Sequence, residues 1–161
     1  MAMLSAVEDS VIFARDIDPE INARLQQAVA CAHDFERARD LMLEAMALDP
    51  DQLAVHIALY KFYFYRGYLD EAEAIVMQAL DRASQQGQFT ADWRNLTVDS
   101  ANWRAGDGPE RVFLYSLKAL SFICLRKQKR QTALDILNKL EDLDPDDQVG
   151  SSVIAALAEG A

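Results

Sequence analysis

The stretch YLDEAEAIVMQALDRASQ, residues 68–85, recurs in diverged form at two other places in the chain. The related segments are DFERARDLMLEAMALDPD at residues 34–51 and RQTALDILNKLEDLDPDD at residues 130–147. Aligned on Ala38, Ala72 and Ala133, they lie 34 and 61 positions apart, and 61 is one 34-residue period plus 27 inserted residues. A fixed period of this size is typical of stacked supersecondary units. The sequence therefore predicts an all-α solenoid.

The spacing of apolar residues predicts antiparallel helix pairs that stack as one domain over residues 1–161. The three pairs are expected at about residues 19–50, 53–84 and 110–145, with an N-terminal helix over 3–15 and a C-terminal capping helix over 146–159. Residues 84–110 form a polar, glycine-containing insertion in which a short helix is expected at 92–102. Alanine at the repeated positions lets paired helices approach closely while keeping helix propensity high.

Composition narrows the possible partners and compartments. Hydrophobic residues make up 51% of the chain, but no apolar run approaches the roughly 20 residues of a membrane helix. The net charge of −10 opposes binding to nucleic acid and to anionic lipid. The first ten residues carry Glu8 and Asp9 but no basic residue, which is unlike a secretory signal. With only two cysteines, the sequence predicts a cytoplasmic protein that binds neither nucleic acid nor membrane.

The sequence contains no arrangement typical of catalysis. His33 falls in an inter-helix turn and His56 on a packed helix position, and neither has a neighbour suited to proton transfer. Cys31 and Cys124 are 93 positions apart and lack a metal-binding spacing. The Asp-Pro-Asp tracts after residues 48 and 143 lack the central glycine of a calcium loop, so helix capping explains them better. We therefore predict a non-enzymatic protein without cofactor or metal.

The three units resemble the tetratricopeptide repeat. That family places large and small apolar residues in a fixed order on a first helix, then two alanines on a second helix that ends before a proline. The matching residues are Asn22, Leu25, Gln26, Val29, Ala38, Met42, Ala45 and Pro50; then His56, Leu59, Tyr60, Tyr63, Ala72, Val76, Ala79 and Ser84; then Leu117, Leu120, Ser121, Cys124, Ala133, Leu137, Leu140 and Pro145. Gly67 falls at the inter-helix turn, where the family usually has glycine. No unit has the family's tryptophan.

The resemblance implies a superhelix whose concave groove is lined by the first helix of each pair. Carried over by register, the groove would present Arg24, Gln27, Ile57, Lys61, Phe64, Tyr65, Tyr115, Lys118, Phe122 and Arg126. Its aromatic residues are the expected anchors for a peptide or helix of another protein. The asparagines with which some family members hold a carboxylate are missing, so a carboxylate clamp is not expected. The implied function is that of a scaffold or adaptor.

Several alternatives stay open. Trp93 and Trp103 could pin the insertion onto the solenoid or could form a ligand box, and an insertion folded over the concave face would fill the groove in cis. The basic run from Arg126 to Arg130 is either a solvated turn or a dock for an acidic segment. The chain could also be a secretion chaperone or a homodimeric assembly factor. The segment LDPDDQVGSSVI, residues 143–154, resembles small bacterial repeat proteins encoded near nitrogen-fixation genes.

Overall fold

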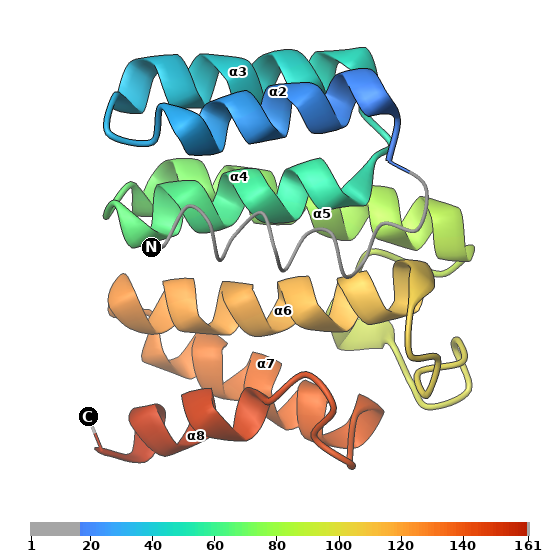
Figure 1. Ribbon diagram of the computed structural model, residues 1–161. Helices are drawn as coiled ribbons and strands as arrows, with labels where there is room; N and C mark the ends of the chain where they lie inside the picture. Colours follow the sequence, from blue (N-terminus) through green and yellow to red (C-terminus); the bar gives the residue numbers. More distant parts are fainter. Residues whose placement is uncertain (1–16, 161) are drawn as a thin grey trace. The chain divides into compact units, whose positions relative to one another are not determined.

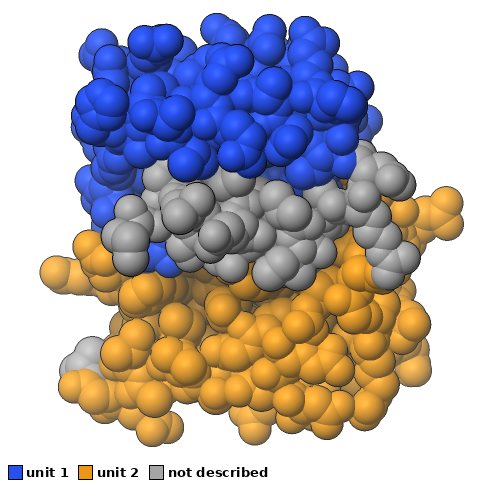
Figure 2. All heavy atoms as spheres, in the orientation of Figure 1, with its two compact units in different colours: residues 1–75 blue, residues 76–161 orange. Residues whose placement is uncertain are grey.

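A computed structural model describes residues 17–160 (Figure 1). Over these residues the chain forms seven α-helices and one short 3₁₀ helix, without any strand, which confirms the predicted all-α class. The helix predicted at residues 3–15 lies outside the described residues. The chain divides into two compact units whose boundary, between Ile75 and Val76, falls inside helix α5 (Figure 2). We call them unit 1 and unit 2 and describe each by itself.

Unit 1 begins with a helix pair that matches the first predicted repeat. Its helices are α2 (Pro19–Ala30), α3 (Phe35–Leu48), α4 (Leu53–Tyr65) and the first part of α5 (Leu69–Gly87). The Oδ1 atom of Asp18 accepts a hydrogen bond from the amide of Glu20 at 2.8 Å, and Pro19 occupies the first turn of α2. Both residues favour the start of the helix, because Asp18 satisfies a first-turn amide that has no partner within the helix and Pro19 has no amide to leave unpaired there.

The repeated alanines lie where the helices pack. Ala28 of α2 and Ala38 and Ala45 of α3 have no exposed surface, and they interleave with the buried Leu25 and Met42. A larger side chain at these positions would force the helix axes apart. Helix α4 is buried on almost all sides, and its apolar residues are accordingly spread around the whole helix instead of along one face. The recurring alanines therefore mark the packing positions within unit 1.

A glycine turn joins α4 to α5. Gly67 has a φ of +83°, a left-handed conformation that costs glycine nothing and other residues about 1 kcal/mol or more. The amide of Gly67 donates to the carbonyl of Phe64 at 3.1 Å, and that of Tyr68 donates to the carbonyl of Tyr63 at 3.0 Å. These two bonds close the last turn of α4 in the manner of a Schellman cap.

Unit 2 contains the third helix pair and the helix that follows it. Its elements are the remainder of α5, the 3₁₀ helix η1 (Trp93–Asn95), α6 (Gly108–Arg126), α7 (Arg130–Leu143) and α8 (Ser151–Gly160). Helix α8 contacts both α6 and α7. The turn between α6 and α7 repeats the turn of unit 1 at an offset of 61 residues, since Gln128 has a φ of +60° and the amide of Lys129 donates to the carbonyl of Cys124.

The predicted helix at residues 92–102 is wrong except for the single turn Trp93–Asn95. Side chains compete for the backbone amides that a helix would use. The Oδ1 atom of Asp92 accepts from the amide of Arg94 at 3.3 Å, and the hydroxyl of Ser100 accepts from the amide of Thr97 at 2.9 Å. The segment therefore folds as a series of side-chain-capped turns.

The helix predicted to begin at residue 146 begins instead at Ser151. The buried carboxylate of Asp144 accepts hydrogen bonds from the amides of Gln148 and Val149, both at 3.0 Å, and Gly150 has a φ of +77°. Asp147 then accepts bonds from the amide and the hydroxyl of Ser152. The aspartates thus cap a loop and the start of α8, as the sequence indicates for the Asp-Pro-Asp tracts.

Candidate functional site

The two groove residues predicted on α2 lie toward its partner helix α3. The guanidinium of Arg24 forms ion pairs with Glu20 at 3.7 Å and with Glu44 of α3 at 3.4 Å. Gln27 lines an open hollow of about 370 Å³ together with Asp34 and Arg37. Register alone placed both residues in the groove, but ion pairing with α3 fixes the direction of Arg24. The structure thus pairs Arg24 with α3 and places Gln27 at an open hollow, and the groove that register assigns to both residues stays a prediction.

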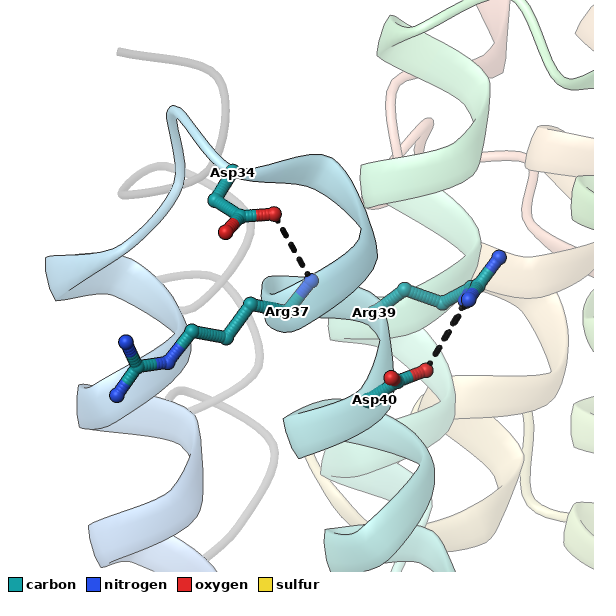
Figure 3. Close-up of polar contacts among 4 residues, drawn as sticks. All are labelled: Asp34, Arg37, Arg39 and Asp40. Carbon is teal, nitrogen blue, oxygen red and sulfur yellow. Dashed lines mark hydrogen bonds and ion pairs between the residues drawn. The ribbon is translucent and has the colours of Figure 1, made fainter.

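The polar groups at the start of α3 are used by the helix itself (Figure 3). Asp34 caps α3, because its Oδ1 atom accepts from the amide of Arg37 at 3.2 Å. The side chain of Arg37 extends away from this bond, and Arg39 pairs with its neighbour Asp40 at 3.2 Å. Both pairs are exposed. The hollow beside Gln27 is consequently lined by a helix cap and surface charges, and its polar side chains do not point toward one common ligand position.

The predicted groove residues of α4 differ in how much surface they expose. Ile57 is fully buried, Lys61 and Phe64 are half-buried, and Tyr65 is 52% exposed. The rings of Phe64 and Tyr65 meet edge to face with their centroids 5.7 Å apart. Phe64 and Tyr65 can therefore meet a partner, whereas Ile57 serves the core.

The C-terminal end of α4 also contributes to a stack of aromatic rings that was not predicted from the sequence. Phe35 stacks on Phe62 with centroids 5.1 Å apart and on Tyr68 with centroids 4.6 Å apart. The guanidinium of Arg66 lies over the Phe62 ring at 4.8 Å and donates to the carbonyl of Ala32 at 2.6 Å. We call Phe35, Phe62, Tyr68 and Arg66 the ring stack. The run of aromatic residues at 60–68 could have indicated a ring cluster in the sequence. The contribution of Phe35 could not be predicted, because Phe35 reaches these rings only in the folded chain.

The ring stack fixes its neighbours as well as itself. Tyr63 lies beside it, with its ring centroid 6.3 Å from that of Tyr68, and burial raises the pKa of its hydroxyl above 10.0 although Arg39 opposes the shift. Tyr68 remains 43% exposed while stacked on Phe35. Exposed rings held in this way lose little further entropy when a partner covers them.

The predicted groove residues of α6 follow one stripe of that helix, and several of them hold α8. The ammonium of Lys118 donates to the carbonyl of Val149 at 2.7 Å and lies 4.8 Å from the centre of the Tyr115 ring. Phe122 packs against a cluster formed by Leu137, Ile154 and Ala158. Arg126 is exposed at the end of α6. In unit 2 the predicted groove residues of α6 therefore serve largely to hold the loop before α8 and α8 itself.

The two tryptophans of the insertion have different environments. Trp103 is 4% exposed, packs edge to face on Phe89, and donates from its indole nitrogen to the carbonyl of Thr97 at 2.9 Å. Trp93 is half-buried, with the guanidinium of Arg94 4.3 Å from its ring centre. Trp103 therefore ties the insertion to the core of unit 2, whereas Trp93 stays at the surface.

Polar contacts draw the insertion onto α7. Arg94 forms an ion pair with Asp135 at 3.3 Å, and Lys139 donates to the carbonyl of Leu96 at 2.7 Å. Both partners belong to the second helix of the pair, while Tyr115 and Lys118 belong to the first. The insertion is thus held on the α7 side of unit 2.

Histidine and cysteine do not assemble into a reactive group within residues 17–160. His56 is buried with its Nδ1 atom 3.1 Å from the carbonyl of Gln52, while His33 is exposed. Within the described residues, neither Cys31 nor Cys124 forms a disulfide. In the described part of the chain, no three histidine, cysteine or acidic side chains are grouped so that they could hold a metal ion. Each helix there is also too short or too polar to cross a bilayer.

Comparison with known proteins gives one relative of note. No family model matches the chain, and no solved structure matches it. The chain is similar to an uncharacterized 19.8 kDa protein in the nifW 5′ region of Azotobacter chroococcum mcd 1. The two are 29% identical over 119 residues, which cover 73% of this chain and 67% of the relative.

Proposed function

We propose that this protein is a helical-repeat binding module that holds a segment of another protein against the aromatic end of α4. One observation carries the proposal: Tyr65 and Tyr68 are 52% and 43% exposed at the same helix end, beside the half-buried Phe64. Tyrosines are enriched among the residues that dominate binding energy at protein interfaces. We call Phe64, Tyr65 and Tyr68 the aromatic patch.

The support beneath the patch suits a binding surface. Tyr68 stacks on Phe35, which in turn stacks on Phe62, and the guanidinium of Arg66 lies against both rings, 4.8 Å from the centre of Phe62 and 5.8 Å from that of Phe35. A ring that is already fixed before binding contributes its contact area without a large ordering cost. The patch can therefore act as a rigid anchor for an apolar side chain of the partner.

The charge of unit 1 favours a basic partner segment. Residues 17–75 contain eleven acidic and five basic side chains, a net charge of −6 from this part of the chain. Such a field accelerates association with a positively charged segment and weakens as salt rises. We propose an extended or helical peptide with an apolar anchor flanked by lysine or arginine, bound without catalysis.

The test compares two exposed apolar positions. We expect Tyr65→Ala to weaken capture of the partner roughly 10-fold, the effect of losing an interface residue worth about 1–2 kcal/mol. Val98→Ala is the matched control, because Val98 is 62% exposed and lies in the insertion. Tagged variants would be purified from the source cells, their partners quantified by mass spectrometry, and the affinity of the identified segment measured by calorimetry. Equal affinity of Tyr65→Ala and the original protein would contradict the proposal.

The relative favours a nitrogen-fixation setting as a second, narrower proposal. Its description places it in the 5′ region of nifW, and the similarity covers 73% of this chain. We propose that the partner is a protein of nitrogen fixation, for which this chain would be an assembly factor. The same purification tests this, with cells grown under nitrogen-fixing conditions. Recovery of an unfolded export substrate instead would replace it with the function of a secretion chaperone.

A further inference from the structure

Helix α8 turns an apolar face away from the core of unit 2. Ile154 and Ala158 pack inward with Leu137, whereas Val153 and Leu157 are 63% and 50% exposed on the opposite side. Ala156 lies exposed between them. A helix that closes a repeat stack needs a polar outer face for solubility. Ser152 and Glu159 are also exposed on α8, but the strip formed by Val153, Ala156 and Leu157 is apolar, and we expect a partner to cover it.

The two ends of α8 carry opposite charge. At its C-terminal end, Arg130 donates to the carbonyl of Ala158, which brings the α6–α7 turn to this end of the helix. That turn contains four basic residues: Arg126, Lys127, Lys129 and Arg130. At the other end, Glu141 and Asp147 border an open hollow of about 300 Å³ between α7 and α8. Four exposed acidic residues occur in that region, Glu141, Asp142, Asp146 and Asp147. Asp146 pairs with Arg104 at 2.9 Å, so the acidic character of this end comes mainly from the other three.

We infer that the outer face of α8 binds a second copy of this chain, with the two α8 helices packed antiparallel about a two-fold axis. Helices α7 and α8 lie side by side and run in opposite directions, so one end of this layer is basic and the other acidic (Figure 1). Antiparallel pairing sets the basic end of each copy against the acidic end of the other. A surface that is its own complement in this way is what a two-fold interface requires.

The size of the face sets the strength of the dimer. Helix α8 has 10 residues and is therefore about 15 Å long. A contact along one such helix covers less than the roughly 800 Å² per partner of a standard interface. The dimer is accordingly weak, with a dissociation constant in the micromolar range, and salt weakens it because its charges lie at the rim.

Sedimentation velocity over roughly 1 µM to 1 mM tests the apolar part of the contact. We expect the original chain to pass from monomer to dimer across this range, and its dissociation constant to rise in high salt. The variant Val153→Asp/Leu157→Asp should stay monomeric, whereas Val98→Asp, an equally exposed change in the insertion, should dimerise normally. Circular dichroism would show that all variants keep their helices. A chain that is monomeric throughout, or a dimer untouched by the α8 changes, would overturn the inference.

A charge swap tests the antiparallel arrangement itself. In Arg126→Glu/Lys127→Glu/Lys129→Glu the four-residue basic end becomes net acidic, so both ends of the layer are acidic. In Glu141→Lys/Asp142→Lys/Asp146→Lys the acidic end becomes net basic, so both ends are basic. Each variant alone should be monomeric, because like charges meet at both ends of the contact. Mixed in equal amounts, the two should form a heterodimer with a dissociation constant within about threefold of the original, since opposite charges again face each other. Failure of the mixture to associate would exclude the proposed pairing.

Discussion

The α4–α5 turn of unit 1 and the α6–α7 turn of unit 2 have the same hydrogen bonds but different residues. Each residue in a left-handed conformation, Gly67 or Gln128, is followed by one whose amide bonds a carbonyl five residues earlier. Unit 1 uses glycine and adds the ring stack, whereas unit 2 accepts a strained glutamine. The repeat thus preserves backbone geometry while each unit stabilises it in its own way.

The same contrast extends through both units. In unit 1, distant segments meet mainly through stacked rings, as Phe35 does with Phe62 and Tyr68. In unit 2, several cationic side chains reach backbone carbonyls across 28–43 positions of sequence, from Lys118, Arg111, Arg130 and Lys139. Each unit also has an example of the other kind of contact, from Arg66 to Ala32 in unit 1 and between Phe89 and Trp103 in unit 2. Ring stacking depends little on salt, while contacts of charged side chains weaken as salt rises. The two units should therefore respond differently to mutation and to solvent.

The largest expected effect is in the ring stack. We expect Phe62→Ala to lower the free energy of unfolding by about 3–5 kcal/mol, because Phe62 is 2% exposed and its removal leaves a cavity between Phe35 and Arg66. Urea unfolding measures the loss, and amide hydrogen exchange locates it in residues 17–75. The control Tyr65→Ala, at an exposed position, should change stability by about 0.5 kcal/mol or less. A loss below about 1 kcal/mol for Phe62→Ala would refute the structural role of the stack.

A smaller effect should separate the two turns. Gln128→Gly should raise the free energy of unfolding by about 0.5–1 kcal/mol, since glycine adopts a φ of +60° without strain. Gly67→Ala should lower it by about 1 kcal/mol for the converse reason. Gln128→Ala serves as the control and should be close to neutral. Thermal and urea unfolding of the three variants measures these differences. A Gln128→Gly variant no more stable than Gln128→Ala would contradict the prediction.

The smallest expected effect is an acid response confined to unit 2. Hydrogen bonds from Ser152 hold the pKa of Asp147 below its ordinary value of 3.8, and bonds from Gln131 and Arg94 do the same for the pKa of Asp135. Because the folded pKa is the lower one, the stabilisation is complete above pH 3.8 and is lost as the pH falls through the folded value.

NMR can follow this loss at the start of α8. The amide chemical shifts of Ser152 and Val153 should change in a titration from about pH 6 to about pH 2.5, as the bond from the Ser152 amide to Asp147 is lost. Asp147→Asn is the matched control, because an amide side chain does not titrate, and it should show no such transition. If the transition persisted in that variant, another group would be responsible.

Much of the fold could be predicted from periodic residues. Ala38, Ala72 and Ala133 mark buried positions on three helices, and Gly67 marks a turn, because packing and backbone strain act locally on those residues. The start of α8 could not be predicted, since it depends on where the Asp144 carboxylate finds its amide partners. Irregular segments are fixed by such individual hydrogen bonds, which leave no period in the sequence.

The candidate site was predictable only in part, because register gives a helix face but not its neighbours. Tyr65 is exposed, in line with the predicted face, whereas Arg24 turns to Glu44 and Phe122 to the helix α8 cluster. The role of Phe35 in the ring stack also escaped prediction, as it joins residues about 30 positions away. Contacts between elements therefore decide which residues of a predicted face remain available.

The placement of the tryptophans has a practical consequence for following the protein in solution. The indoles of Trp93 and Trp103 are the chain's two tryptophans, and both belong to unit 2. Trp103 is shielded beneath Phe89, so its emission should lie to the blue and shift to the red when that core opens. Tryptophan emission, excited at wavelengths that tyrosine does not absorb, consequently reports on unit 2, and unit 1 gives no such signal until a tryptophan is introduced there.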